Sequence, residues 1–269
     1  MRDRTENTKT FVNADTGEGE TYYFTEPVHF KSDTGKWENF DTTLVKNGAK
    51  NWTANETARE VTTPKVVTKK AMPTLSLDGA KVSVRPSGDT DLTQVAAEDN
   101  RIMYASEDAK TEPFTMQADS FGMELGQYVK TGDEKAQQVT FDLTVPDGVT
   151  LKDDRKRAAT LIYHGETLIG AIPSPVLEDE TGSVMDTLEA KTVKTEAGYQ
   201  LQVEKFSTAT VTGSLAKVTV SFISTKITNG IKATSLGQMK YGRSTKTVIL
   251  TRKKAKNFLK KWASGAFSH

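Results

Sequence analysis

The histidines are the side chains of this sequence best suited to acid–base or metal chemistry, and there are three of them: His29, His164 and His269. No two stand at the spacing of a His-x-x-x-His or His-Glu-x-x-His zinc motif. A serine hydrolase can bring a distant Ser, His and Asp together, but the Gly-x-Ser-x-Gly elbow that would support one is absent from the sequence. We therefore expect no catalytic residue and no enzyme activity, with His29 partly buried in a strand and His164 in a hairpin turn.

Carboxylates gather at four places, residues 15–20, 89–91, 153–154 and 178–180. Glycine accompanies several of these clusters, which favours solvated turns. Carboxylate oxygens also suit Ca²⁺, so a loop calcium site is the sharper alternative, although none of the clusters has the EF-hand spacing. We expect no metal and no cofactor.

Tryptophan is the residue type most able to stack on a sugar ring, and the sequence has three, Trp37, Trp52 and Trp262. Sugar binding by Trp37 or Trp52 is one interpretation. Packing in a core or an interface is the more common fate of this side chain, and it is the one we expect here.

Charge is distributed unevenly along the chain. Residues 205–269 hold 13 Lys and Arg and no Asp or Glu, whereas residues 1–204 hold the other 23 basic residues and all 35 acidic ones, a net charge of −12. Such asymmetry predicts either an anionic partner for the C-terminal segment or docking of that segment on the acidic remainder.

Residues 251–266 are the one segment that reads as a helix, because their apolar residues recur in steps of three and one and fall on a single face. That apolar face consists of Ala255, Phe258, Leu259 and Trp262, continued by Ala263 and Ala266. The cations that we expect to meet an anionic partner are Lys240, Arg243, Lys246, Arg252, Lys253, Lys254, Lys256, Lys260 and Lys261.

Three roles for this basic segment stay open. It can dock on the body of the protein, or it can lie on an anionic cell-wall polymer or membrane surface, where a Lys-rich face opposite apolar residues is typical. Nucleic acid is the least favoured partner, because no helix-turn-helix, zinc-finger or aromatic RNA-binding motif accompanies the charge. A protein partner is also compatible with the sequence, which does not indicate an oligomeric state.

The remaining sequence indicates an all-β fold. Alternating Thr- and Val-rich runs recur at short intervals and are separated by turn clusters such as Asp78-Gly79, and no strand–helix alternation occurs. The pattern predicts an antiparallel β-sandwich-like architecture with a basic, partly helical C-terminal tail. The predicted strands span residues 21–31, 37–44, 81–85, 101–105, 114–117, 122–129, 139–145, 159–163, 167–172, 199–204 and 217–224.

Two units are predicted, a β-rich region over residues 1–228 and the basic tail over residues 229–269. A polar stretch at 62–73 offers a further subdivision of the first unit. No segment of about 20 apolar residues could span a bilayer, and the polar start of the chain does not resemble a signal peptide. The sequence has no cysteine, which excludes disulfide scaffolds, thiol catalysis and Cys-ligated metals.

Several segments occur in an order that resembles a known family. They are RTENTKTF at 4–11, EPVHFK at 26–31, GKW at 35–37 and DTTLV at 41–45, followed by FDLTVPDGV at 141–149 and LIGAIPSPV at 168–176. Together they resemble the N-terminal β-rich region of bacterial wall-associated and YD-repeat (Rhs-type) secreted surface proteins. The resemblance covers about residues 4–225, is weakest over 46–135, and does not extend into the tail.

The resemblance implies a secreted or cell-surface location and a β-rich module without catalytic residues. We therefore expect a non-catalytic exported module in cell-surface architecture, display or adhesion. Binding of an anionic polymer or membrane through the basic tail is the alternative, and a secreted toxin component is a further one.

Overall fold

The computed structural model describes residues 5, 8–12, 15, 19–23, 28–32, 34–107, 111–132, 136–211 and 213–224. Within these residues the fold is all-β, and every strand pairing is antiparallel, as the sequence predicted. The described part of the chain contains no helix long and apolar enough to cross a membrane. The predicted tail and its helix at 251–266 lie outside the described residues, as does the tail boundary at 229.

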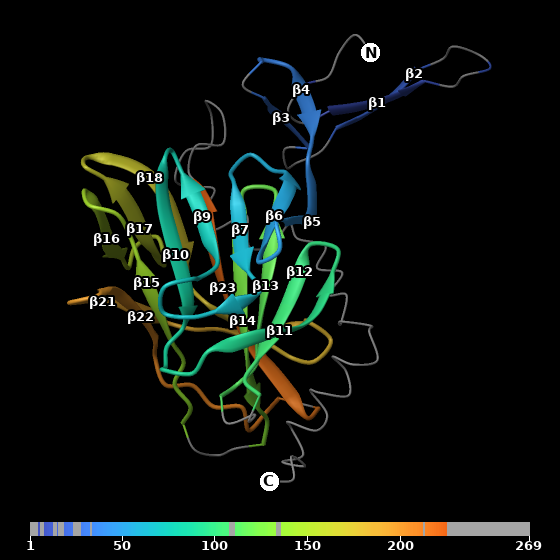
Figure 1. Ribbon diagram of the computed structural model, residues 1–269. Helices are drawn as coiled ribbons and strands as arrows, with labels where there is room; N and C mark the ends of the chain where they lie inside the picture. Colours follow the sequence, from blue (N-terminus) through green and yellow to red (C-terminus); the bar gives the residue numbers. More distant parts are fainter. Residues whose placement is uncertain are drawn as a thin grey trace.

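Two sheets form the body of the protein as a β-sandwich (Figure 1). The one with fewer strands, called the small sheet below, has eight, in the order β21 (Ala190–Thr195), β22 (Gly198–Val203), β15 (Thr140–Thr144), β10 (Ala80–Pro86), β9 (Thr74–Leu77), β7 (Val61–Pro64), β6 (Asn51–Glu56) and β5 (Asp41–Asn47).

The large sheet has eleven strands. Nine of them follow the order β16 (Val149–Asp154), β17 (Ala159–His164), β18 (Thr167–Pro173), β23 (Leu215–Ser224), β14 (Gly122–Lys130), β13 (Phe114–Asp119), β12 (Arg101–Ala105), β11 (Leu92–Glu98) and β8 (Val66–Val67). The other two are β19 (Val176–Glu178), which pairs with β23 beside β18, and β20 (Val184–Thr187), which pairs with β19.

Two small hairpins precede the sandwich, β1 (Thr8–Val12) with β2 (Gly19–Tyr23), and β3 (His29–Lys31) with β4 (Trp37–Asn39). They project from one end of the body, next to β5 (Figure 1). In the second hairpin the paired strands are only three residues long, shorter than the strands predicted at 21–31 and 37–44. At the start of the second hairpin His29 is buried, whereas Val28 and Phe30 are half-buried.

The core lies between the two sheets and is built by strict alternation along the strands. In β10, Val82 and Val84 are fully buried, and in β23 Val218, Val220 and Phe222 are fully buried. These residues belong to one continuous apolar cluster. Because neighbouring side chains of a strand point to opposite faces, Arg85 and Lys217 must point away from this core.

The hairpin between β9 and β10 is a two-residue turn, as the sequence predicted. Asp78 and Gly79 occupy positive φ angles of 48° and 85° between the paired residues Leu77 and Ala80. Two positive φ angles suit the right-handed twist of a hairpin, and glycine adopts such an angle without steric cost.

The Asp147-Gly148 turn does not join the two strands of a hairpin, although Asp-Gly is typical of hairpin turns. It joins β15 of the small sheet to β16 of the large sheet, so it carries the chain from one layer to the other. The stretch at 62–73 also changes layers, because β7 belongs to the small sheet and β8 to the large one, and Thr63 and Val67 are buried.

Candidate functional site

The candidate site of the described residues is a pocket on the outer face of the small sheet, the face turned away from the core. Its floor is a polar row of three residues, Arg85, Asp142 and Gln200, on the adjacent strands β10, β15 and β22. The strand register places Asp142 opposite Arg85 on one side and opposite Gln200 on the other. Their chain neighbours Val84 and Leu201 are buried in the core, which fixes the outward direction of the row.

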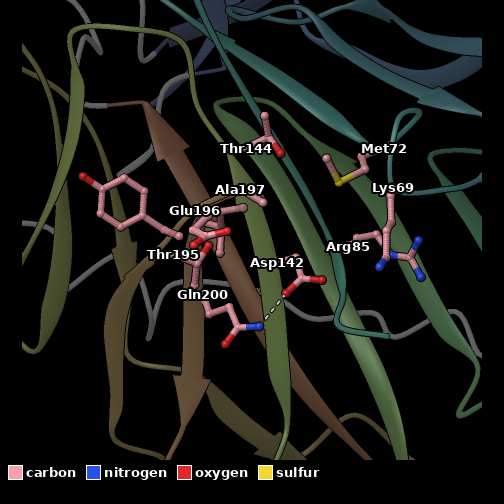
Figure 2. A pocket seen from close by; sticks show the side chains of 11 residues that line it. Lys69, Met72, Arg85, Asp142, Thr144, Thr195, Glu196, Ala197 and Gln200 are labelled. Carbon is pink, nitrogen blue, oxygen red and sulfur yellow. Dashed lines mark hydrogen bonds between the residues drawn. The ribbon is translucent and has the colours of Figure 1, made fainter. Parts of the chain in front are cut away.

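Asp142 is the centre of the hydrogen bonds in the polar row. Its Oδ1 accepts a hydrogen bond from Ser87 Oγ at 2.6 Å and another from Gln200 Nε2 at 3.0 Å. The bond from Gln200 is the dashed line in Figure 2. Gln202 Nε2 donates in turn to Gln200 Oε1 at 3.4 Å. These bonds hold the carboxylate and the amide in fixed orientations beneath the pocket.

Arg85 is 1% exposed although it points away from the core. Its Nε donates to the carbonyl oxygen of Pro86 at 3.0 Å, and one terminal nitrogen donates to that of Thr90 at 2.7 Å. The other terminal nitrogen, Nη1, is buried without a hydrogen-bond partner. Burial lowers the pKa of the Arg85 guanidinium. The negative charges of three carboxylates oppose that shift, and Asp142 has the largest effect of the three.

The pocket has a volume of about 420 Å³. One wall comes from Lys69 and Met72 in the loop between β8 and β9, and the opposite wall from Glu196 and Ala197 in the turn between β21 and β22 (Figure 2). The remaining lining residues are Leu143, Thr144, Thr195 and Tyr199. Two cations and two carboxylates therefore line the pocket, so a neutral ligand with several hydrogen-bonding groups suits it best.

The two described histidines lie in a strand and beside a hairpin turn, close to the predicted positions, although His29 is more deeply buried than expected. His29 is 2% exposed, and its Nδ1 lies 2.8 Å from the carbonyl oxygen of Thr5. His164 is exposed at the end of β17, beside the turn at Gly165. Neither residue lines the pocket.

The two described tryptophans are half-buried and make contacts of their own. Trp52 packs against the core, and its indole Nε1 donates to Gln94 Oε1 at 3.1 Å. The ammonium of Lys31 lies 5.1 Å from the ring centroid of Trp37. Packing, the fate expected for Trp52, is confirmed, and neither ring lines the pocket.

Among the described residues no three His, Cys, Asp or Glu side chains come together as metal ligands. Asp153, Asp154 and Glu178 do not lie in the solvated turns that we expected, whereas Asp179 and Glu180 lie at the turn after β19. Asp153 and Asp154 end strand β16, and Asp153 accepts hydrogen bonds from Thr160 and Thr192. Glu178 is buried in β19.

The residues of the polar row were not among the predicted site residues. Their positions in the sequence lie 57 and 58 residues apart, and only strand pairing brings them together. The only local sign of this site in the sequence is Arg85, a charged residue at the end of the predicted strand 81–85. All the predicted partner-binding and apolar residues of the tail, from Lys240 to Trp262, lie outside the described residues.

No model of a protein family, no curated protein and no solved structure matches this chain.

Proposed function

We propose that this chain is a non-catalytic, exported β-sandwich module of the cell surface, and that its pocket on the small sheet binds a saccharide unit. In this role the module serves surface architecture, display or adhesion. The observation that carries the proposal is the polar row of Arg85, Asp142 and Gln200 at the floor of the pocket.

A saccharide matches the chemistry of that floor. Hydroxyl groups both donate and accept hydrogen bonds, and the pocket offers carboxylate acceptors in Asp142 and Glu196 and donors in Lys69 and the side-chain hydroxyls of Thr144 and Thr195. Apolar surface from Met72, Leu143 and Ala197 can contact the carbon face of a sugar ring. The volume of about 420 Å³ lies within the usual range for small-molecule sites, roughly 300–1,000 Å³.

The location at the cell surface rests on the sequence resemblance alone. The blocks at 4–45 and 141–176 resemble the N-terminal region of wall-associated and YD-repeat proteins, and a saccharide-binding module would suit a protein that contacts cell walls.

The test is a binding measurement on the full chain with soluble fragments of bacterial wall polysaccharide, by calorimetry or by a glycan array. Gln200→Ala should weaken binding at least tenfold, because it removes an oriented amide from the floor of the pocket. Gln138→Ala is the matched control, since Gln138 is exposed and does not line the pocket. Absence of saccharide binding, or equal binding by both variants, would overturn the proposal.

The second candidate is binding of an anionic polymer or membrane through the basic tail. The observation that favours it is the charge of residues 225–269, which hold 11 Lys and Arg and no Asp or Glu. Such binding should weaken steeply as salt rises and should disappear when residues 229–269 are deleted. Binding that is insensitive to salt would remove this candidate.

A further inference from the structure

A row of hydroxyl side chains crosses the outer face of the small sheet. The strand registers place five of them opposite one another in turn, Thr144, Ser83, Thr74, Thr62 and Thr53. They belong to the neighbouring strands β15, β10, β9, β7 and β6, the last four of which lie side by side in Figure 1. We call these five residues the hydroxyl row.

The hydroxyl row points away from the core. The chain neighbours of its members are buried in the core, and they are Leu143, Val84, Leu75, Val61 and Ala54. Because successive side chains of a strand alternate between the two faces, the hydroxyl groups lie on the outside of the small sheet. Thr144 is exposed and the other four are half-buried, so the row is open to a ligand.

Hydrogen bonds orient the hydroxyl groups of the row. Thr74 Oγ1 donates to the carbonyl oxygen of Met72 at 3.0 Å and lies 2.7 Å from Ser83 Oγ. A hydroxyl group has one proton, so Ser83 must donate to Thr74, and Ser83 Oγ is left as an acceptor. At the far end, Thr53 Oγ1 accepts from Asn47 Nδ2 at 3.1 Å and keeps its own proton to donate. The row therefore offers both donors and acceptors in set directions.

The hydroxyl row leads into the pocket on the same face. Thr144, its first member, lines the pocket, as does Met72, whose carbonyl group accepts from Thr74 (Figure 2). The pocket also contains a polar group that needs a partner, because Arg85 is 1% exposed and its Nη1 has no hydrogen-bond partner. A buried donor without an acceptor costs free energy, which favours a ligand that brings oxygen atoms to this end of the row.

We infer that the hydroxyl row and the pocket form one extended surface that binds a linear, neutral polysaccharide, with one sugar in the pocket and the following sugars across β10, β9, β7 and β6. This inference rests on the proposed function, because the pocket proposed for a saccharide unit is one end of the surface. It adds the class of ligand, which is a chain of several sugars.

Charge argues for a neutral polymer. All five side chains of the hydroxyl row are uncharged, whereas the outward positions of the large sheet include Glu124, Lys217 and Glu178. An anionic or cationic polymer would find no countercharge along the row. The hydroxyl groups of a neutral sugar can both donate to the row and accept from it.

Length and position argue for a polysaccharide and against a peptide. Five strands about 4.8 Å apart span about 19 Å, several times the width of one sugar ring. The row lies on the face of the sheet, where the backbone groups are already paired between strands. An extended peptide binds instead at the edge of a sheet, where those groups are free.

The test is titration calorimetry of the full chain with neutral chito-, cello- and malto-oligosaccharides of two to six sugars. In a series that binds, Kd should fall at least tenfold between the disaccharide and the tetrasaccharide. The double variant Thr53→Val/Thr62→Val removes two hydroxyl groups at almost unchanged shape, so it should weaken tetrasaccharide binding at least fivefold and leave disaccharide binding unchanged. Thr150→Val is the matched control, because Thr150 is an exposed threonine on β16 of the large sheet.

The same Kd for the disaccharide and the tetrasaccharide, with binding that Gln200→Ala weakens, would overturn the extended surface and leave the pocket as a single-sugar site. Equal tetrasaccharide binding by the parent and the double variant would overturn it too. If wall polysaccharide fragments bind while all three neutral series fail, the inference is wrong and the proposed function stands; failure of every probe overturns both. If the double variant melts well below the parent, Thr62→Val alone is measured, and it should weaken tetrasaccharide binding at least twofold.

Discussion

Glu178 and Lys217 form a nearly buried ion pair on the outer face of the large sheet, with 2.7 Å between Oε2 and Nζ. They lie opposite each other on β19 and β23, and Thr219 Oγ1 also donates to the carboxylate at 3.1 Å. The pair fixes the register of β19 against β23 at the place where β18 and β19 share one edge of that strand.

The first prediction concerns this pair. Lys217→Met should lower the free energy of unfolding by about 3 kcal/mol, because it leaves a buried carboxylate without its cation. The double variant Glu178→Leu/Lys217→Met should cost less than about 1 kcal/mol, since it removes both charges. Urea unfolding of the three proteins checks this, and a double variant as unstable as the single one would contradict it.

The second prediction concerns alkaline pH. Tyr104 is fully buried, donates to the carbonyl oxygen of Pro64 at 2.6 Å, and lies 2.7 Å from Thr63 Oγ1. Burial raises the pKa of Tyr104 above its ordinary value of about 10. Above that pH the unfolded chain releases the phenolic proton while the folded chain keeps it, so the stability that this group contributes is present below about pH 10 and is lost as pH rises.

Urea unfolding at pH 8.5 and pH 11 measures this loss. Tyr104→Phe should be less stable than the parent at pH 8.5, by about 1–3 kcal/mol, because a buried acceptor loses its donor. It should lose less stability than the parent between the two pH values. Tyr163→Phe is the control, because Tyr163 lies outside the main core, and it should reproduce the alkaline loss of the parent.

The third prediction concerns the close approach of β14 and β23. A Cβ atom added to Gly122 would lie 1.8 Å from the backbone oxygen of Phe222. Gly122→Ala should therefore destabilise the protein by about 3 kcal/mol or more, since two paired strands must separate to admit a methyl group. Gly88→Ala is the comparison, because nothing lies within 4 Å of the added atom there, and its cost comes only from the positive φ of 141°.

Thermal melts of both variants give the measurement. Gly122→Ala should melt well below Gly88→Ala. Equal melting temperatures would show that the β14–β23 ladder adjusts without cost.

The fourth prediction concerns Trp262, which lies outside the described residues. If the apolar face of the predicted tail helix packs on the β-rich body of the protein, Trp262→Ala should lower the stability of the whole protein by about 3–5 kcal/mol, the usual cost of deleting a buried large aromatic side chain. Lys253→Ala, on the opposite side of the predicted helix, should leave the melting temperature nearly unchanged. An unchanged midpoint for Trp262→Ala would contradict docking of the tail.

Much of the β structure could be predicted from the sequence because alternation is a local property. The strand predicted at 101–105 is β12 with the same ends, and the strand predicted at 217–224 lies within β23. In such segments every second residue is apolar, and one face of each strand must be buried whatever its partners are. The Asp78-Gly79 turn could be predicted for the same reason, since its backbone angles depend only on the residues that adopt them.

Strands without that alternation were missed. β6 contains Asn, Thr and Glu around a single buried Ala54, and β21 has no fully buried residue. β21 is an edge strand of the small sheet and β6 is next to the strand at the other edge. Strands near an edge are more exposed to solvent than central strands, so polar residues are tolerated in them. Their sequences therefore carry little of the signal that marks a central strand.

Only the tertiary structure decided which strands pair and what lies on the outer faces. Nothing near Arg85 indicates that β10 pairs with β15, or that β15 pairs with β22, yet these pairings create the polar row and the pocket above it. The large sheet likewise pairs β14 with β23, whose partner residues lie between 85 and 101 positions apart in the sequence. The amino-acid sequence determined the faces of the strands, because side-chain direction alternates residue by residue, whereas the site depends on long-range pairings that no local pattern encodes.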